Sequence, residues 1–286
     1  MKSIIMTGAN GFVGSYFKSK YADKYNIQTF SFLKDDFNSL NVNHTDVIIY
    51  LSALVHQMGG ATKEEYEKVN VTQTLELAKK AEESGVKHFI FMSSIKVYGE
   101  ETNVAYSETS TCKPKDVYGK SKLKAENELR KLESDAFKVS IIRTPIVYGY
   151  GVKANIKNLM SLIQKVPLLP FGNIQNKRSM IYIGNLCHLV DVIIEKKESG
   201  VFLAADDKPL STTKLIELIA QELDRKVYLL NIPLFPWLLK KLKPSFYKRL
   251  YESLEVDNTK TKEILNFQNP YSVEEGIKLM LHGELV

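Results

Sequence analysis

Apolar positions along the chain follow two alternating patterns. Short runs rich in β-branched and aromatic residues predict buried strands, and they cover residues 2–6, 27–32, 46–51, 89–93 and 139–143. Stretches with apolar residues three and four apart predict helices, at 72–84, where Gly85 follows, and at 118–132. Strands that alternate with helices in this way favour a doubly wound parallel sheet of the α/β class.

Three glycines, Gly8, Gly11 and Gly14, follow the first predicted strand, and a helix-like stretch continues to about residue 25. A strand, a glycine turn and a helix start in this order are the setting of a dinucleotide-binding fingerprint. Gly8 permits the tight turn, Gly11 lets the backbone approach a pyrophosphate, and Gly14 lets the helix pack against the strand. Free N–H groups at the helix start can then meet the phosphates.

Tyr118 and Lys122 are about one helical turn apart, so a helix presents both side chains on one face. A cation held beside a phenol favours the phenolate and moves the tyrosine pKa toward the neutral range. A tyrosine tuned in this way can transfer a proton to or from a sugar or alcohol oxygen. Exposed Tyr–Lys pairs on helices share this spacing, so the other motifs of the chain must show whether this pair is catalytic.

Taken together, these motifs resemble the extended short-chain dehydrogenase/reductase family, and more narrowly its sugar-nucleotide epimerases, dehydratases and 4-keto-reductases. The glycine spacing is three and three, and the Tyr-x-x-x-Lys pair follows about a hundred residues later. Nearly the whole chain matches, with the clearest segments at 89–99, 118–126 and 141–149 and at Glu108 and Pro114. The resemblance implies a Rossmann-like dinucleotide-binding domain over residues 1–150 and about 178–205. A smaller α/β C-terminal substrate lobe would comprise about 151–177 and 206–286.

Single residues acquire roles from the resemblance. Tyr118 would transfer the proton, Ser94 would hydrogen-bond and orient the reacting oxygen, and Lys122 would bind the nicotinamide ribose. The other implied cofactor contacts are Asn10, Phe12 and Val13 along the pyrophosphate, Leu51 and Ala53 at the adenosine ribose, Asn70 behind the nicotinamide, and Pro145 after its strand. Packing is the alternative for each of these minor positions.

The residues after the second predicted strand bear on the choice of cofactor. An acidic residue there would bind the ribose 2′-hydroxyl of NAD, but Phe32, Leu33 and Lys34 occupy the place. Lys34 could accept a 2′-phosphate, so we expect NAD(P)H with a slight preference for NADPH. Asp36 and Phe37 resemble the family's pair that holds the adenine, with a simple turn as the alternative.

On the substrate side, Arg178 resembles the family's arginine that clamps the nucleotide diphosphate, a role that suits its planar fork. His56 lies near the expected substrate, although a satisfied loop histidine is the alternative. Ile146 and Asn185 depart from the family's usual Asn and Asp. The segments 144–149 and 167–179 are more similar to bacterial UDP-N-acetylhexosamine 4-keto-reductases, which serve O-antigen and capsule synthesis.

We therefore expect an NAD(P)-dependent oxidoreductase that transfers hydride from NAD(P)H to a UDP-linked 4-keto-6-deoxy-N-acetylhexosamine. The alternative is a UDP-sugar 4-epimerase, which keeps NAD tightly bound and returns the hydride. A non-catalytic nucleotide-binding sensor is disfavoured because Ser94, Tyr118 and Lys122 are all present. The resemblance also implies a homodimer, joined through the helices at 72–84 and 118–132.

Composition limits the alternatives. The 286 residues, 44% hydrophobic and 25% charged, suit a globular protein with an ample core. Neither a membrane span nor a signal peptide is expected, and the two cysteines form no disulfide or metal-site pattern, which favours a cytoplasmic protein. The net charge of +6 is spread along the chain, whereas a nucleic-acid site would concentrate it. The positive excess is explained by lysines on a solvated surface, or by binding of an anionic nucleotide sugar.

One segment has two explanations. Residues Ile232 to Leu242 are apolar and are followed by lysines, so they could lie on an anionic membrane surface. The prolines in this segment break any long helix, and the segment falls in the expected substrate lobe. Core packing is therefore the preferred interpretation.

Overall fold

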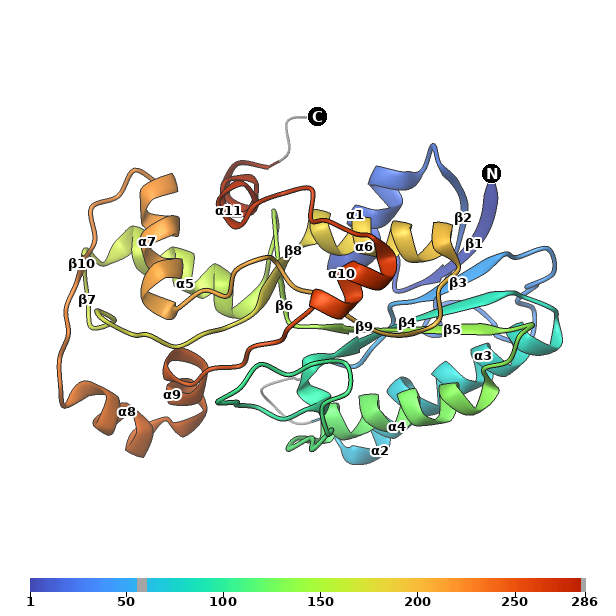
Figure 1. The fold of residues 1–286 in the computed structure, drawn as a ribbon, viewed down its shortest axis with the longest axis horizontal. Coiled ribbons are helices and arrows are strands. Elements are labelled where there is room, and N and C mark those ends of the chain that lie inside the picture. The colour runs from blue at the N-terminus through green and yellow to red at the C-terminus, as the bar shows by residue number, and fades with distance from the viewer. Residues whose placement is uncertain (56–60, 284–286) are drawn as a thin grey trace.

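A six-stranded parallel sheet forms the centre of the structure, a computed structural model that describes residues 1–55 and 61–283. The strand order is β2-β1-β3-β4-β5-β9, and all neighbours run parallel (Figure 1). The strands are β1 (Lys2–Thr7), β2 (Tyr25–Phe30), β3 (Val47–Tyr50), β4 (His88–Ser94), β5 (Lys138–Thr144) and β9 (Gly200–Leu203). The predicted doubly wound fold is confirmed. The strand order reverses between β1 and β3, and ligands of such sheets bind at the carboxyl ends of the strands there.

Helices cover both faces of the sheet. In Figure 1, α1 (Phe12–Tyr21) and α6 (Ile183–Lys196) lie above it, and α3 (Gln73–Glu83) and α4 (Val117–Leu132) lie below it. The central strands are therefore buried on both sides, and all four residues of β3 are inaccessible to solvent or nearly so. A strand covered on both faces needs apolar side chains at every position, which is why these strands are continuous apolar runs.

Two predicted boundaries differ from the structure. The second strand begins at Tyr25 and ends at Phe30, two residues earlier than predicted, because its backbone pairs with β1 from Lys2 to Thr7. The predicted helix at 72–84 is α3, but it is preceded by a short helix α2 (Lys63–Glu67) and a π-helical turn η1 (Lys68–Thr72). Apolar periodicity does not reveal such a turn, because its extra residue shifts the helical phase.

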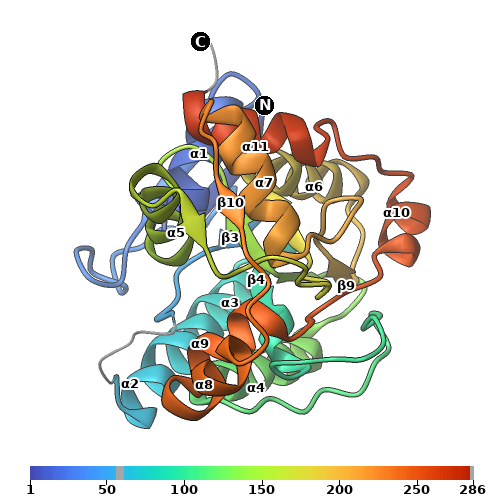
Figure 2. The same ribbon diagram turned by 90° about the vertical axis from the view of Figure 1, so that its left-hand side faces the viewer.

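The remaining elements follow β5. Two two-stranded sheets pair β6 (Ile146–Tyr148) with β8 (Met180–Tyr182), and β7 (Leu168–Leu169) with β10 (Tyr228–Leu229). The helices are α5 (Ala154–Lys165), α7 (Thr212–Glu222), α8 (Phe235–Leu242), α9 (Pro244–Tyr251), α10 (Thr259–Leu265) and α11 (Val273–His282), and the turn η2 (Ile95–Val97) follows β4. Figure 2 views the end of the molecule that carries α5, α7, α8 and α9.

This end of the molecule shares its core with the sheet. Ile163 of α5 and Ile216 and Ile219 of α7 belong to the same buried cluster as Ile4 and Met6 of β1. The second large cluster lies under α3 and α4 on the opposite face. The predicted domain limits near residues 150, 178 and 205 fall outside the helices and the named strands, and the division into two domains stays a prediction.

Within residues 1–55 and 61–283, no helix combines the length and the apolar character needed to cross a membrane. The same part of the chain contains no cluster of three or more His, Cys, Asp or Glu side chains suited to a metal ion.

A buried histidine at the start of β4 should make the protein sensitive to acid. His88 is 2% exposed, and its Nε2 lies 2.6 Å from Ser140 Oγ, whose own hydrogen is donated to Glu198 O. Nδ1 has no partner among the described residues. Burial, with the nearby Lys2 charge, lowers the pKa of His88 from 6.5 to about 4.

The unfolded chain therefore takes up this proton first as the pH falls. Stability linked to His88 is complete above pH 6.5 and declines until about pH 4, by roughly 3 kcal/mol. Urea denaturation between pH 7 and 4 measures the slope, with His88→Gln as the non-titrating control. A variant that loses stability as steeply as the wild type would contradict this assignment.

Candidate functional site

The glycine turn after β1 is built by close backbone contacts. Gly8 has φ +70°, and a Cβ there would lie 2.9 Å from the Leu51 carbonyl carbon. A Cβ on Gly14 would lie 2.4 Å from Gly8 O, and Gly11 N donates to the same oxygen at 2.9 Å. The first turn of α1 thus packs directly against the glycine turn, which no larger residue would permit.

The start of α1 is open for a ligand. Gly11 is its N-cap and supplies no side-chain cap, so the first N–H groups of the helix meet no side chain of their own cap. Asn10 is exposed, and Phe12 and Val13 are half-buried. A helix start with free N–H groups and a glycine cradle fits the pyrophosphate of a dinucleotide.

The loop after β3 is fixed next to this turn. Thr7 Oγ1 accepts hydrogen bonds from the backbone N–H groups of Leu51 and Ser52, both at 3.1 Å. The fully buried Asn70 in the π-helical turn holds Leu54 through N–H···Oδ1 and Nδ2–H···O bonds of 2.8 and 3.0 Å. It also donates to Ser121 Oγ of α4 at 3.0 Å. Asn70 therefore joins the loop that carries Leu51 and Ala53 to the helix that carries Tyr118.

The residues predicted at the adenine end are engaged in a turn. Asp36 accepts from the backbone N–H of Asn38 at 3.1 Å, and the Phe37 ring stacks on Phe32 at 5.4 Å. Residues 31–46 form turns without a helix, and Lys34 is exposed among them. The local contacts of Asp36 and Phe37 are therefore those of a simple turn, the alternative considered in the sequence analysis.

Ser94 and Tyr118 meet where β4 ends and α4 begins. Asp116 caps α4 by accepting from Gly119 N at 2.7 Å. A Cβ at Gly119 would lie 2.7 Å from Lys96 O of the turn η2, so the glycine lets α4 approach the residues after Ser94 closely. Sequence reasoning did not assign this role to Gly119. The Ser94 hydroxyl acts on the Tyr118 phenol in the direction that lowers its pKa.

Lys122 is almost fully buried, with an exposed fraction of 1%. Its Nζ donates to Met92 O of β4 at 2.7 Å and lies 4.3 Å from the centre of the Phe91 ring. Burial lowers the pKa of Lys122 to about 7, against the opposing effect of the Glu126 carboxylate. The ammonium is therefore readily neutralised in the free protein.

The expected lowering of the Tyr118 pKa is wrong for the free protein. Burial raises the pKa of Tyr118 to about 12, and the hydrogen bond to Ser94 offsets this only in part. Removal of the phenol from water is the largest cause because the phenolate loses its hydration, and the nearby Asp116 carboxylate raises the pKa further. At neutral pH Tyr118 therefore keeps its proton in the free protein. A further positive charge in the site would favour the phenolate.

A buried ion pair beneath Ser94 was not assigned a role from the sequence. Arg143 of β5 binds Glu126 of α4 through two nitrogens, with Nη2 2.6 Å from Oε2. Ser93 Oγ donates to Glu126 Oε1 at 2.5 Å, and Arg143 Nη1 donates to Tyr98 OH at 2.7 Å. The network thus ties β4, α4 and β5 together at the point where Ser94 leaves the sheet. The sequence signal for this buried ion pair was the presence of an arginine, Arg143, within the apolar run 139–143.

Arg178 lies in an extended segment that bridges to Leu210 and Leu254. Its Nη1 donates to Glu252 O at 3.0 Å, just past the end of α9, and burial lowers its pKa. Pro145 is half-buried between β5 and β6. His56 lies outside the residues that the structure describes.

Asn185 has a structural explanation. Its Nδ2 donates to the buried Asp206 carboxylate at 2.8 Å and to Tyr271 O at 2.9 Å, while Oδ1 accepts from Tyr271 N. Asp206 also accepts from the Tyr148 hydroxyl at 2.6 Å. An aspartate at position 185 would face this carboxylate with a like charge and without a donor. The departure from the family pattern therefore follows from Asp206 and carries no information about the substrate.

Comparisons with known proteins agree with this geometry. Residues 4–204 match the model of the NAD dependent epimerase/dehydratase family. The chain is 39% identical to a UDP-glucose 4-epimerase of Vibrio cholerae, covering 97% of this chain and 94% of that protein. It is 25% identical to the N-acetyl-alpha-D-glucosaminyl-diphospho-ditrans,octacis-undecaprenol 4-epimerase of Escherichia coli O157:H7, covering 99% and 96%.

Among solved structures, the UDP-N-acetylglucosamine 4-epimerase of Methanobrevibacter ruminantium M1, in complex with UDP-N-acetylmuramic acid, has a TM-score of 0.81 at 21% identity. The similarity covers 99% of this chain and 97% of that chain, and it supports the same fold. Fold, glycine turn and family match point the same way, and the chain belongs to the NAD-dependent epimerase/dehydratase family.

Proposed function

We propose that the protein is an NAD-dependent 4-epimerase of a UDP-linked hexose. The observation that carries the proposal is the packing of α4 on the end of β4: Gly119, next to Tyr118, lies against the turn that follows Ser94, and the buried Lys122 donates to Met92 O. The 39% identity to the Vibrio cholerae UDP-glucose 4-epimerase supports it.

The 4-keto-reductase preferred from the sequence has less support than its alternative. Both curated relatives described above are 4-epimerases. Asn185, which departs from the family's usual residue, is explained by its bond to Asp206. The other departure, Ile146, lies in the segment that resembles the reductases and is 38% exposed. The preference for NADPH and the homodimer stay predictions.

Within this proposal each residue has a defined task. Gly8, Gly11 and Gly14 would hold the pyrophosphate of NAD at the start of α1, and the bound cofactor would supply reversible hydride exchange at the sugar carbon. Ser94 Oγ would orient the sugar 4-hydroxyl, and Tyr118 would remove its proton and later return it. Because its pKa is raised in the free protein, Tyr118 can remove a proton only when a positive charge lies beside it and favours the phenolate.

A conversion assay tests the proposal. We expect the purified protein, loaded with NAD, to interconvert UDP-glucose and UDP-galactose, or their N-acetylated counterparts, without net change in NADH absorbance. Nuclear magnetic resonance of the sugar products measures the conversion. Net oxidation of NADPH with a UDP-4-keto sugar, together with no interconversion of 4-epimers, would overturn the epimerase in favour of the reductase.

A further inference from the structure

Helices α8 and α9 form a hairpin whose apolar side chains stay largely in contact with solvent. Neither helix contains a buried residue. Leu234, Trp237 and Leu242 are 76%, 62% and 68% exposed. Phe235, Leu250 and Tyr251 are partly buried against the core, and the Phe235 ring packs edge-on against Phe171 at 6.1 Å. The core packing expected for residues 232–242 is therefore wrong for most of the segment.

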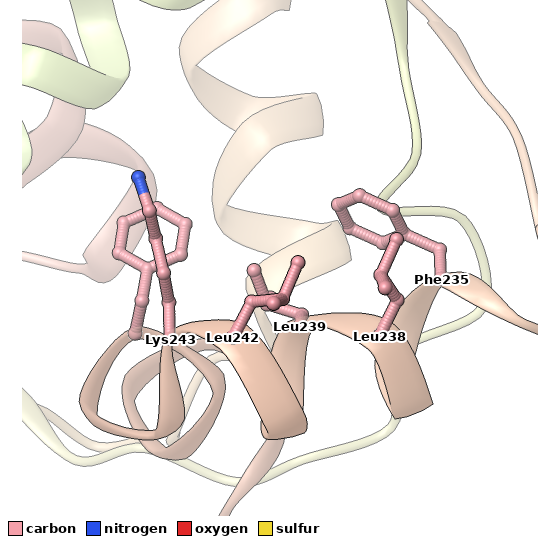
Figure 3. Close-up of a pocket in the computed structure, with 6 residues that line it drawn as sticks. Phe235, Leu238, Leu239, Leu242 and Lys243 are labelled. Atoms are coloured by element: carbon pink, nitrogen blue, oxygen red, sulfur yellow. The ribbon is translucent and has the colours of Figure 1, made fainter.

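The two helices enclose an open apolar groove of about 280 Å³. Its lining residues are Phe235, Leu238, Leu239, Leu242, Lys243 and Phe246. Figure 3 shows the leucines rising from one side of α8, with Phe235 and Lys243 at the two ends. Apolar residues three and four apart give α8 one continuous apolar face, on which Leu238 and Leu242 are 46% and 68% exposed.

Positive charge surrounds the apolar side chains. The segment 232–252 contains five cations, Lys240, Lys241, Lys243, Lys248 and Arg249, and one carboxylate, Glu252. Among the described residues, no carboxylate forms a salt bridge with the first three of these lysines, and all three are exposed. Lys241 Nζ lies 5.4 Å from the Trp237 ring centre and Lys240 Nζ lies 5.3 Å from that of Tyr247, so each ammonium sits beside an aromatic ring.

We propose that the α8–α9 hairpin docks on an anionic membrane surface. Helices of this kind place Trp, Leu and Phe side chains at the boundary between headgroups and acyl chains, and their lysines meet the lipid phosphates. The inference does not depend on the proposed epimerase activity.

The hairpin is fixed to the rest of the protein by contacts at α9. Lys248 Nζ lies 3.5 Å from a carboxylate oxygen of Glu101 in the loop after η2. Arg178 donates to Glu252 O at the end of α9. Docking through α8 and α9 would therefore hold the side of the molecule that carries Arg178 toward the lipid.

Charge argues against a second copy of the chain as the occupant. Two hairpins that faced each other would bring together two sets of unpaired lysines, which repel. An anionic lipid surface satisfies the lysines and the apolar side chains at once.

The chain contains a single tryptophan, Trp237, and it lies on this hairpin. Trp237 does not line the groove but is 62% exposed beside Lys241, so the fluorescence of the unmodified protein reports on the lysine-bearing side of α8. We expect a blue shift of the emission on addition of phosphatidylglycerol-containing vesicles at low salt, and no shift with phosphatidylcholine vesicles. The shift should disappear in molar salt, because exposed charges are then screened within about 3 Å. Flotation of the protein with the vesicles measures binding independently.

A matched pair of variants locates the contact. Reversal of Lys240, Lys241 and Lys243 to glutamate should weaken vesicle binding by about a hundredfold or more. The control reverses three exposed lysines of other elements, Lys208, Lys260 and Lys278, and so changes the net charge equally. It should retain nearly all binding, and thermal melting shows that both variants fold.

Three results would overturn the proposal. The first is no flotation and no emission shift at low salt. The second is equal loss of binding in both triple variants, which would mean a general charge effect. The third is an emission shift that depends on protein concentration without lipid, which would assign the hairpin to self-association.

Discussion

Replacing Tyr118 with phenylalanine should lower the rate of 4-epimerisation by a factor of about 10²–10⁴ while the fold stays intact. The change removes one oxygen, the atom that would exchange the proton with the sugar hydroxyl. The ring is retained, so its contact with Tyr66, at 6.4 Å between ring centres, is preserved. The initial rate of UDP-sugar interconversion at saturating substrate measures the effect.

Tyr66 supplies the matched control. It is a neighbouring buried tyrosine whose hydroxyl donates to Val55 O at 3.2 Å, and Tyr66→Phe removes the same atom from a position with no proposed chemical task. We expect its rate to stay within a few fold of the wild type. Equal rates for Tyr118→Phe and the wild type would exclude Tyr118 as the proton carrier.

Replacing Arg143 with methionine should lower the free energy of unfolding by about 3–5 kcal/mol. Arg143 and Glu126 are 2% and 0% exposed, so the variant leaves an uncompensated carboxylate in the core. Tyr98 also loses the donor to its hydroxyl oxygen. Urea denaturation at neutral pH, followed by circular dichroism, measures the loss.

A second variant separates the buried charge from simple loss of packing. In Arg143→Met combined with Glu126→Leu, both members of the ion pair are removed, and apolar replacements of buried ion pairs are often neutral or stabilising. We expect the double variant to be more stable than Arg143→Met alone. A loss below about 1 kcal/mol in the single variant would mean that water reaches Glu126.

The sheet could be predicted from the sequence because its strands are buried on both faces and therefore stand out as apolar runs. The glycine turn could also be predicted, because Gly8 and Gly14 leave no room for a Cβ next to the local backbone. The π-helical turn at Asn70 could not be predicted, since the hydrogen bonds of the Asn70 side chain run to Leu54 and Ser121, which are distant in sequence.

Electrostatic properties were the least predictable part of the site. The spacing of Tyr118 and Lys122 gave their common helix face but not their burial, and burial dominates both pKa values. The exposure of α8 and α9 was missed for a related reason. Their apolar pattern is the same whether the covering surface belongs to this chain or to something outside it.

The bond between Asn185 and Asp206 constrains how this part of the protein can change during evolution. One amide and one carboxylate share a buried space that accommodates a single negative charge. We expect relatives that carry an aspartate at position 185 to carry a neutral side chain at position 206, and the reverse. The two positions would then vary together in an alignment, although they lie 21 residues apart, and neither alone would indicate a change of substrate.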